Sequence, residues 1–262
     1  MGKKLIYYSI NENYLDTLDI ALNSLRENKT EDIDILIITN SICEEVLLEK
    51  HNDLLYHVVE KKHTSESMAG QNKYKIATYD GLENYEKVIY LDSDTLVIKD
   101  INILFDYMNE DEVYTNQGYG SDLSHKTFSF GLTGEEIKQI KSEKRFGLNS
   151  GVFGFTKKQI PFMKLLNDFV QGNKHNKLEA SYDQPFFGTF MYRNSKTYKQ
   201  FGCPLHSPDC ENVLINNEGI HNSHKNLDTV VIVHFAGQIG LGGMKRNHMI
   251  KFLNSGYINT PA

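Results

Sequence analysis

The chain has 262 residues, of which 40% are hydrophobic and 24% are charged, which is typical of a folded globular protein. Its net charge is −6 and its lysines are scattered, so it lacks the basic stripe that nucleic acid binding requires. Three cysteines are too few for a disulfide framework, and no apolar run reaches the ~18 residues that span a bilayer. We therefore expect a soluble cytoplasmic protein without a signal peptide and without a nucleic acid partner.

Short apolar segments alternate with segments of helical periodicity along most of the chain. This alternation predicts an α/β fold with a mostly parallel central sheet flanked by helices. No shift in composition marks a boundary, so residues 1–262 are expected to form a single domain. The predicted strands are 5–10, 33–39, 56–59, a strand that ends at Asp92, 151–155 and 230–235. The predicted helices are 14–25, 73–79, 101–108, 161–170 and 244–253.

The segment 116–148 differs from the rest of the chain. It has weak periodicity and is rich in Gly, Ser and Lys. Long irregular segments inside a compact domain are usually functional or mobile. We therefore expect an irregular segment here, at the rim of a binding site.

The strand that ends at Asp92 carries a second aspartate, Asp94, with Ser93 between them. Side chains alternate along a strand, so the two aspartates are expected on one face. Two carboxylates at the end of a buried strand repel each other unless a cation lies between them. The pattern therefore predicts a metal site, although two acidic residues after an apolar run also occur in simple turns.

Another buried strand, 230–235, places His234 near its carboxyl end. Ligands of open α/β sheets bind outside the carboxyl ends of the strands, so Asp92, Asp94 and His234 would form a three-ligand set with vacant positions. Such carboxylate-rich sites suit Mn²⁺ or Mg²⁺, and the histidine favours Mn²⁺. A core or capping role for His234 remains the alternative.

The glycine-rich segment 237–243 follows, and it leads to Lys245 and Arg246 at the start of a helix. Successive N–H groups and a helix N-terminus together form an anion-binding site, so this segment predicts a diphosphate cradle. It does not match the P-loop pattern, and glycines also serve plain turns.

A zinc cluster is a further interpretation of the sequence, with Cys203, His206 and Cys210 as ligands. Structural zinc sites have four ligands, and the sequence offers no clear fourth one. A loop bounded by Pro204 and Pro208 is the preferred interpretation.

Several motifs occur in order along nearly the whole chain: 8–14, Lys75, 90–94, 148–153, 182–184 and 234–237. This ordered set resembles the glycogenin-like family 8 glycosyltransferases of the GT-A fold, a Rossmann-like nucleotide-binding domain. The resemblance implies a metal-dependent retaining enzyme that moves a hexose, most commonly glucose or galactose, from a UDP-sugar to a hydroxyl acceptor. The implied partners are the UDP-sugar and a glycan, protein or small-molecule acceptor, and a homodimer is left open.

The resemblance also implies roles for individual residues. Asp183, Gln184 and Asn149 would act at the reacting carbon or the acceptor. The family's phosphate-binding lysine falls on Gly240 here, so either a displaced basic residue or backbone amides would take its place. Lys245 is preferred over Arg246 for this role. The nucleotide and the donor sugar would contact Tyr8, Ile10, Asn11, Tyr14, Lys75, Ser93, Ser150, Gly237 and Lys245.

Some of these residues have plainer interpretations, and other protein classes share parts of the pattern. Asp183 is equally suited to cap the helix that follows it, and Lys75 to a solvated helix face. Haloacid-dehalogenase-type phosphatases also use two such aspartates, but they usually carry Thr or Val where Leu96 stands. A pyrophosphorylase requires a glycine-rich loop after its first strand, which residues 9–12 do not provide. A nucleotide-sugar-binding protein without catalysis is the third alternative.

Overall fold

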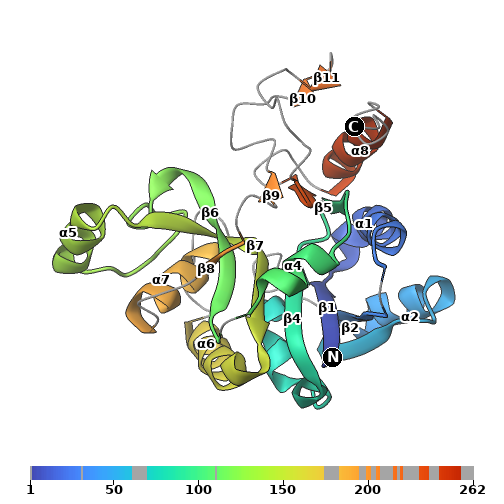
Figure 1. The fold of residues 1–262 in the computed structure, drawn as a ribbon, viewed down its shortest axis with the longest axis horizontal. Coiled ribbons are helices and arrows are strands. Elements are labelled where there is room, and N and C mark those ends of the chain that lie inside the picture. The colour runs from blue at the N-terminus through green and yellow to red at the C-terminus, as the bar shows by residue number, and fades with distance from the viewer. Residues whose placement is uncertain are drawn as a thin grey trace.

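A seven-stranded sheet forms the centre of the computed structural model (Figure 1). Its strand order is β3-β2-β1-β4-β7-β6-β8. Strands β3, β2, β1 and β4 are mutually parallel, β7 is antiparallel to both β4 and β6, and β8 is parallel to β6. The predicted mostly parallel sheet is therefore confirmed. The structure describes residues 2–30, 32–60, 70–109, 111–173, 183–194, 199–201, 205–206, 215–216, 219–220, 230–235 and 242–254.

The strands belong to three sheets. The central sheet consists of β1 (Lys3–Ser9), β2 (Asp34–Asn40), β3 (Leu55–Glu60), β4 (Tyr85–Leu91), β6 (Val113–Asp122), β7 (Phe146–Thr156) and β8 (Lys199–Gln200). A small sheet of order β5-β12-β9 consists of β5 (Thr95–Val97), β12 (Ile232–His234) and β9 (Leu205–His206). Strands β10 (Ile215–Asn216) and β11 (Gly219–Ile220) pair only with each other in the described part of the chain.

Helices cover the central sheet. The α-helices are α1 (Leu15–Glu27), α2 (Ser41–Lys50), α4 (Asn102–Tyr107), α5 (Gly134–Ser142), α6 (Ile160–Asn173), α7 (Gln184–Asn194) and α8 (Gly242–Asn254). Short 3₁₀ helices are η1 (Glu12–Tyr14), η2 (Asn72–Thr78), η3 (Leu82–Asn84) and η4 (Lys157–Gln159). No helix in the described ranges is both long enough and apolar enough to cross a membrane.

The alternation of side chains along the central strands produces two cores, one on each face of the sheet. In β1, Ile6 and Tyr8 pack into the core that also contains residues of α1, α8 and β12. Leu5 and Tyr7 pack into the opposite core, which contains residues of η2, α6 and α7. Every one of these four side chains is fully buried. This two-sided burial explains why β1 has an apolar run without polar alternation.

Most of the predicted elements are confirmed, with ends that differ by one to three residues at most positions. The predicted helix 73–79 is a 3₁₀ helix, η2, and the predicted strand 151–155 is the second half of the longer β7. Helix α2 was not predicted, although Asn40 caps its first turn by accepting a hydrogen bond from the Cys43 N–H at 2.8 Å. N-cap chemistry of this kind is visible in a sequence.

The prediction of an irregular segment over 116–148 is wrong. This range contains most of β6, all of α5 and the start of β7. Helix α5 begins with a capping box, in which Thr133 and Glu136 each bond to the other's backbone N–H. Only Ile140 of this helix is buried, but Ile137 and Ile140 lie three residues apart behind the Thr133–Glu136 pattern, so the sequence does carry signals for this helix.

Candidate metal centre and sugar-nucleotide site

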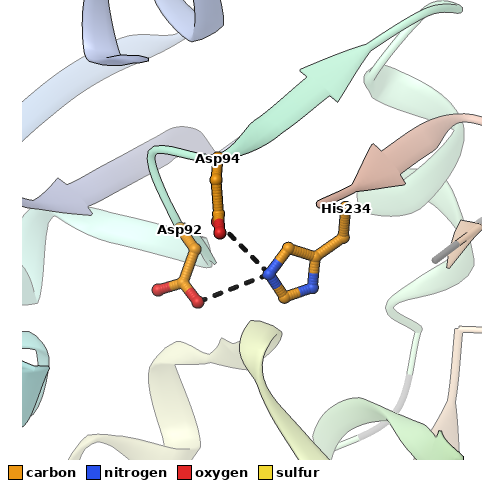
Figure 2. Close-up of side chains that lie close together, drawn as sticks. All are labelled: Asp92, Asp94 and His234. Atoms are coloured by element: carbon orange, nitrogen blue, oxygen red, sulfur yellow. Dashed lines mark ion pairs between the residues drawn. The ribbon is translucent and has the colours of Figure 1, made fainter. Parts of the chain in front are cut away.

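Asp92 and Asp94 lie in the turn that joins β4 to β5. The turn is closed by two bonds to the Asp92 carbonyl, from the Thr95 N–H at 3.2 Å and from Thr95 Oγ1 at 2.7 Å. The expected side-by-side placement of the two aspartates is found, but the expected cause is wrong. Their side chains are directed to the same place by a turn, and not by alternation along a strand (Figure 2).

His234 reaches the aspartates through strand pairing. Strand β12 is antiparallel to β5, with His234 opposite Thr95, and the Phe235 N–H bonds to the Asp94 carbonyl at 2.9 Å. The histidine therefore comes from the small sheet, and not from the central parallel sheet as expected. Its Nε2 lies 3.5 Å from Asp92 Oδ2 and 3.3 Å from Asp94 Oδ1 (Figure 2).

These three residues offer one ligand atom each within 4.8 Å of one another, and no other such group of three or more occurs in the described ranges. Two carboxylates and one imidazole are a suitable donor set for Mn²⁺ or Mg²⁺. In the alternative zinc cluster, Cys203 and Cys210 lie outside the described residues, as does the side chain of His206.

Gly151 of β7 leaves the space that this cluster occupies. Its carbonyl accepts a hydrogen bond from the Asp92 N–H at 2.8 Å, so the two backbones are in contact. A Cβ atom at this position would lie 2.2 Å from Cε1 of His234 and 2.5 Å from Oδ2 of Asp92. Any side chain here would displace both candidate ligands, which explains the need for glycine.

Positive groups surround the two aspartates. Burial raises the pKa of each carboxyl, but Lys73 and His234 beside Asp92, and Lys245 and His234 beside Asp94, outweigh it, so both pKa values are lowered. Burial lowers the pKa of His234, but the two carboxylates raise it to about 9. The site therefore favours positive charge between its acids, and a cation bound there would replace the imidazole proton, because a metal-bound imidazole is neutral.

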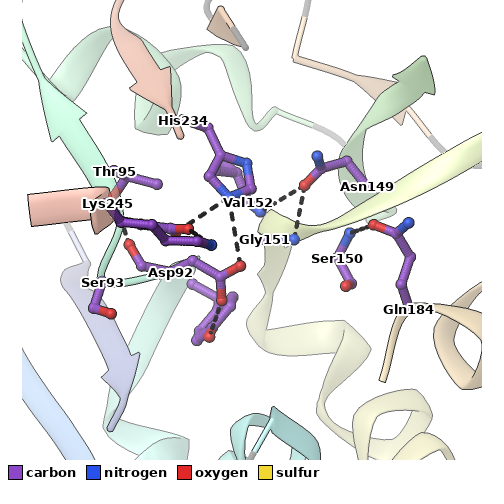
Figure 3. Close-up of polar contacts among 12 residues, drawn as sticks. Asp92, Ser93, Thr95, Asn149, Ser150, Gly151, Val152, Gln184, His234 and Lys245 are labelled. Atoms are coloured by element: carbon purple, nitrogen blue, oxygen red, sulfur yellow. Dashed lines mark hydrogen bonds and ion pairs between the residues drawn. The ribbon is translucent and has the colours of Figure 1, made fainter. Parts of the chain in front are cut away.

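Lys245, in the first turns of α8, reaches this cluster as an ion-pair partner of Asp94 Oδ2 (Figure 3). Burial lowers its pKa, but the charge of Asp94 outweighs that effect, so the pKa is raised. Arg246 is directed elsewhere, since its Nε lies 4.0 Å from Asp16 at the surface. The preference for Lys245 over Arg246 thus matches the positions of the two side chains. Gly237 and Gly240 lie outside the described residues.

A second polar group lies beside the first, where β7 meets the start of α7 (Figure 3). The Ser150 N–H donates to Gln184 Oε1 at 3.3 Å, and Gln184 Nε2 donates to the Thr127 carbonyl at 3.3 Å. Asn149 Oδ1 accepts from the Gly151 N–H at 2.7 Å. Gln184 is therefore held by the backbone of Ser150 and Thr127, and Asn149 by the backbone of Gly151.

Lys73 links the two polar groups, and sequence reasoning missed it. Its Nζ lies 3.3 Å from Asp92 Oδ1 and 2.9 Å from Asp183 Oδ2, and it donates to the Ser150 carbonyl at 3.0 Å. The residue is only 2% exposed. The resemblance singled out Lys75 instead, which is half-buried in the same 3₁₀ helix.

Two buried tyrosine hydroxyls complete the network. Tyr90 donates to Asp92 Oδ1, and Tyr74 donates to Asp183 Oδ2 at 3.1 Å. Burial raises the pKa of Asp183, Lys73 lowers it and Asp92 raises it further, so the pKa lies above its ordinary value. In the sequence, Tyr90 stands in an apolar run, which also describes core residues, and Tyr74 stands between two lysines, so neither position indicates a contact with an aspartate.

Four of the residues expected to hold the nucleotide lie from the end of β1 to the start of α1: Tyr8, Ile10, Asn11 and Tyr14. Tyr8 is fully buried and packs in the core, and its hydroxyl has no hydrogen-bond partner in the described part of the chain. The Tyr8 side chain thus belongs to the core on one face of β1. Ile10 is also buried, and Asn11 Oδ1 caps η1 by accepting from the Asn13 N–H at 2.9 Å. Tyr14 is half-buried beside the core.

Ser93 lies in the same turn as the aspartates. It is buried, and its Oγ accepts a hydrogen bond from Thr17 Oγ1 of α1 at 3.3 Å. This bond connects the β4–β5 turn to the helix that follows Tyr14. The turn is consequently tied to β7 through Asp92, to β12 through Asp94, and to α1 through Ser93.

Solved structures with a similar fold are glycosyltransferases. The galactosyltransferase LgtC, in complex with donor and acceptor sugar analogues, has a TM-score of 0.60 and 15% identity over 96% of this chain and 95% of its own. Mouse xyloside xylosyltransferase 1 has a TM-score of 0.53 and 14% identity over 91% of this chain and 98% of its own. GlyE of Streptococcus pneumoniae has a TM-score of 0.56 and 15% identity over 98% of this chain and 64% of its own.

These likenesses show that the fold is that of the GT-A glycosyltransferases. A comparison with curated proteins found no match. The model of glycosyl transferase family 8 matches residues 5–240, which include the metal-ligand candidates and both polar groups. The chain therefore belongs to glycosyl transferase family 8.

Proposed function

We propose that this protein is a metal-dependent, retaining glycosyltransferase that moves a hexose from a UDP-sugar, glucose or galactose, to a hydroxyl group. The observation that carries the proposal is the convergence of Asp92, Asp94 and His234 on one point, with Lys245 beside it. We infer Mn²⁺ as the cation, with Mg²⁺ as the alternative, and residues 1–262 as one catalytic domain.

Departure of the diphosphate is the step that this cluster serves. Negative charge grows on the leaving oxygen when the bond to the anomeric carbon breaks, and the bound cation supplies Lewis-acid stabilisation there. Asp92, Asp94 and His234 hold that cation. Lys245 would add a second positive charge to the diphosphate, and its ion pair with Asp94 supports this role. Gly237 is proposed to contact the same diphosphate through the glycine-rich segment 237–243.

The neighbouring group is proposed to receive the sugar and the acceptor. Asn149, Ser150 and Gln184 present amide and hydroxyl groups that suit sugar hydroxyls, and their own bonds to the backbone fix their positions. Asp183 orients the acceptor or the sugar, and in a retaining transfer the departing phosphate takes the acceptor's proton. Tyr8, Ile10, Asn11, Tyr14, Lys75 and Ser93 remain proposed contacts of the nucleotide and the donor sugar.

The partners follow from this reaction. The acceptor is a glycan, a protein or a small molecule with a free hydroxyl, and we propose that transfer takes place in the cytoplasm. The alternative of a haloacid-dehalogenase-type phosphatase is not supported, because the chain belongs to a glycosyltransferase family. The alternative of a protein that binds a nucleotide sugar without catalysis is distinguished from the proposed enzyme by measuring turnover.

The decisive experiment is a panel of nucleotide sugars screened for UDP release with Mn²⁺, with Mg²⁺ and with a chelator. We expect release from one UDP-hexose, its loss with the chelator and its recovery on adding Mn²⁺. The configuration of the product at its anomeric carbon, determined by NMR, tests retention. Turnover that persists in the chelator, or no release from any sugar while UDP still binds, would refute the proposal.

A further inference from the structure

We propose that Tyr90 is a positioning residue for Asp92, whose hydroxyl occupies one carboxylate oxygen so that the other alone is presented to the cation. This inference rests on the proposed metal-dependent function, since it concerns how a metal ligand is held. It assigns Tyr90 no contact with the substrate. Asp92 would then hold the cation through Oδ2, the oxygen that faces His234.

The two oxygens of Asp92 have different surroundings. Oδ2 faces His234 Nε2 at 3.5 Å and is the atom beside Gly151. Oδ1 is turned away and accepts hydrogen bonds from the Tyr90 hydroxyl and from Lys73 Nζ. Hydrogen bonds to a carboxylate are about twice as strong as those between neutral groups. Rotation of the carboxylate to present both oxygens to a cation would break these two bonds.

The ring of Tyr90 is itself fixed, so its hydroxyl has a defined direction. Its centroid lies 4.9 Å from that of Tyr7 and 5.1 Å from that of Phe153, and Lys73 Nζ lies 4.6 Å above the ring. Tyr90 is 1% exposed. A ring enclosed in this way cannot turn its hydroxyl elsewhere without disturbing the core. Groups that hold a metal ligand typically change metal affinity about 10–100-fold when they are removed.

Tyr7 provides a matched control in the same aromatic cluster. It is fully buried, it packs against the Tyr90 ring, and its hydroxyl has no hydrogen-bond partner among the residues that the structure describes. Removing the Tyr7 hydroxyl therefore takes one buried oxygen atom from the same aromatic cluster, as removing the Tyr90 hydroxyl does. The two substitutions differ in whether a bond to Asp92 is lost.

The experiment compares Mn²⁺ binding to the full chain and to the variants Tyr90→Phe and Tyr7→Phe. Free Mn²⁺ is measured by electron paramagnetic resonance during a titration with UDP present and without donor sugar, so the result does not depend on turnover. We expect Tyr90→Phe to bind Mn²⁺ about 10–100-fold more weakly. Tyr7→Phe should remain within about twofold of the unsubstituted protein. Circular dichroism melts of the same samples identify any variant that is not folded.

Each result bears on a different claim. Equal Mn²⁺ affinity in Tyr90→Phe and the unsubstituted protein overturns the positioning role while leaving the metal site intact. Equal weakening in both variants overturns it as well, because the cause is then the core and not the bond. If the unsubstituted protein takes up no Mn²⁺, the metal site of the proposed function is wrong, and the role of Tyr90 falls with it.

Discussion

Asp92 and Asp183 share one cation, Lys73, yet their pKa values are shifted in opposite directions. Both carboxyl groups are penalised by burial, which raises the pKa. Around Asp92, the charges of Lys73 and His234 and the bond from Tyr90 outweigh this penalty, so its pKa is lowered. Around Asp183, burial and the charge of Asp92 outweigh the charge of Lys73 and the hydrogen bonds from Lys73 and Ser150, so the pKa is raised.

The opposite pKa shifts of Asp92 and Asp183 indicate which role each carboxylate is suited for. Two neighbouring acids whose pKa values are pushed apart are typical of sites where they have separate roles. Asp92 stays ionised and offers a negative oxygen to a cation. Asp183 accepts a hydrogen bond from the Tyr74 hydroxyl and shares its ion-pair partner, Lys73, with Asp92. It is therefore suited to hydrogen bonding with a neutral group such as a sugar hydroxyl.

Removing a charge from the metal side should have the largest effect. In Asp94→Asn the side chain keeps its shape but loses its charge, so the fold should be retained and the cation lost. We expect metal-dependent turnover to fall about hundredfold to ten-thousandfold, which corresponds to several kcal/mol of transition-state stabilisation. The assay is UDP release at saturating Mn²⁺. Asp111→Asn, at an exposed position beside Lys158, is the control and should leave the rate unchanged. Near-normal turnover in Asp94→Asn would refute the metal site.

A smaller effect is expected on the other side of the comparison. Asp183→Asn keeps the shape of the side chain but cannot pair its charge with Lys73. We expect turnover to fall about 10–100-fold, because an orienting group is lost while the metal ligands remain. The dissociation constant of UDP should change by less than about threefold, since Asp183 is not proposed to contact the nucleotide. Equal losses in turnover and in UDP binding would mean that Asp183 has a structural role.

A substitution of Lys245 tests whether the diphosphate binds beside Asp92, Asp94 and His234. Lys245→Met removes the positive charge beside Asp94, and we expect UDP to bind about tenfold more weakly, which corresponds to about 1.4 kcal/mol. Arg246→Met is the matched control, because Arg246 is the next residue of α8 and faces Asp16 at the surface. UDP affinity is measured by calorimetry at constant Mn²⁺. If the two variants weaken binding equally, the effect is one of general charge and Lys245 has no specific role.

How much of this site is predictable from sequence depends on how each residue reaches it. Asp92, Asp94 and His234 are predictable because two neighbouring carboxylates at the end of a buried strand repel each other unless a cation lies between them, and because His234 also ends a buried strand. The route was only partly right, since His234 is placed by the antiparallel pairing of β12 with β5 and not by a parallel sheet. Strand pairing across distant parts of the chain has no local signature.

Lys73 shows the limit more clearly. It stands two residues before Lys75 in the same segment. In η2, Lys73 is buried against the β4–β5 turn, whereas Lys75 is half-buried. Residues two apart lie on different sides of any helix, so one of the two lysines is expected to face the site. Which one does so depends on how η2 packs against the sheet, and this packing has no local signature in the sequence.

Glu136 lies far from the site, and its pKa is lowered by contacts that have a structural role only. Glu136 at the start of α5 bonds to Arg193 Nε at 2.8 Å and to the Thr133 N–H at 2.7 Å, and these bonds lower its pKa from 4.5 to about 2. Because the folded pKa lies below the unfolded one, the group stabilises the protein above pH 4.5. That stabilisation is lost as the pH falls through about 2.

Glu136→Gln should therefore lower the free energy of unfolding by about 1 kcal/mol at pH 7, the usual contribution of a helix cap or an exposed ion pair. The difference between variant and unsubstituted protein should shrink as the pH falls from 4.5 towards 2. Urea melts at several pH values measure it. Turnover at pH 7 should stay unchanged, since α5 contributes no residue to the proposed site. If Glu136→Gln reduced turnover as Asp94→Asn is expected to, a lowered pKa would mark general stability in this protein, and the contrast between Asp92 and Asp183 would lose its functional meaning.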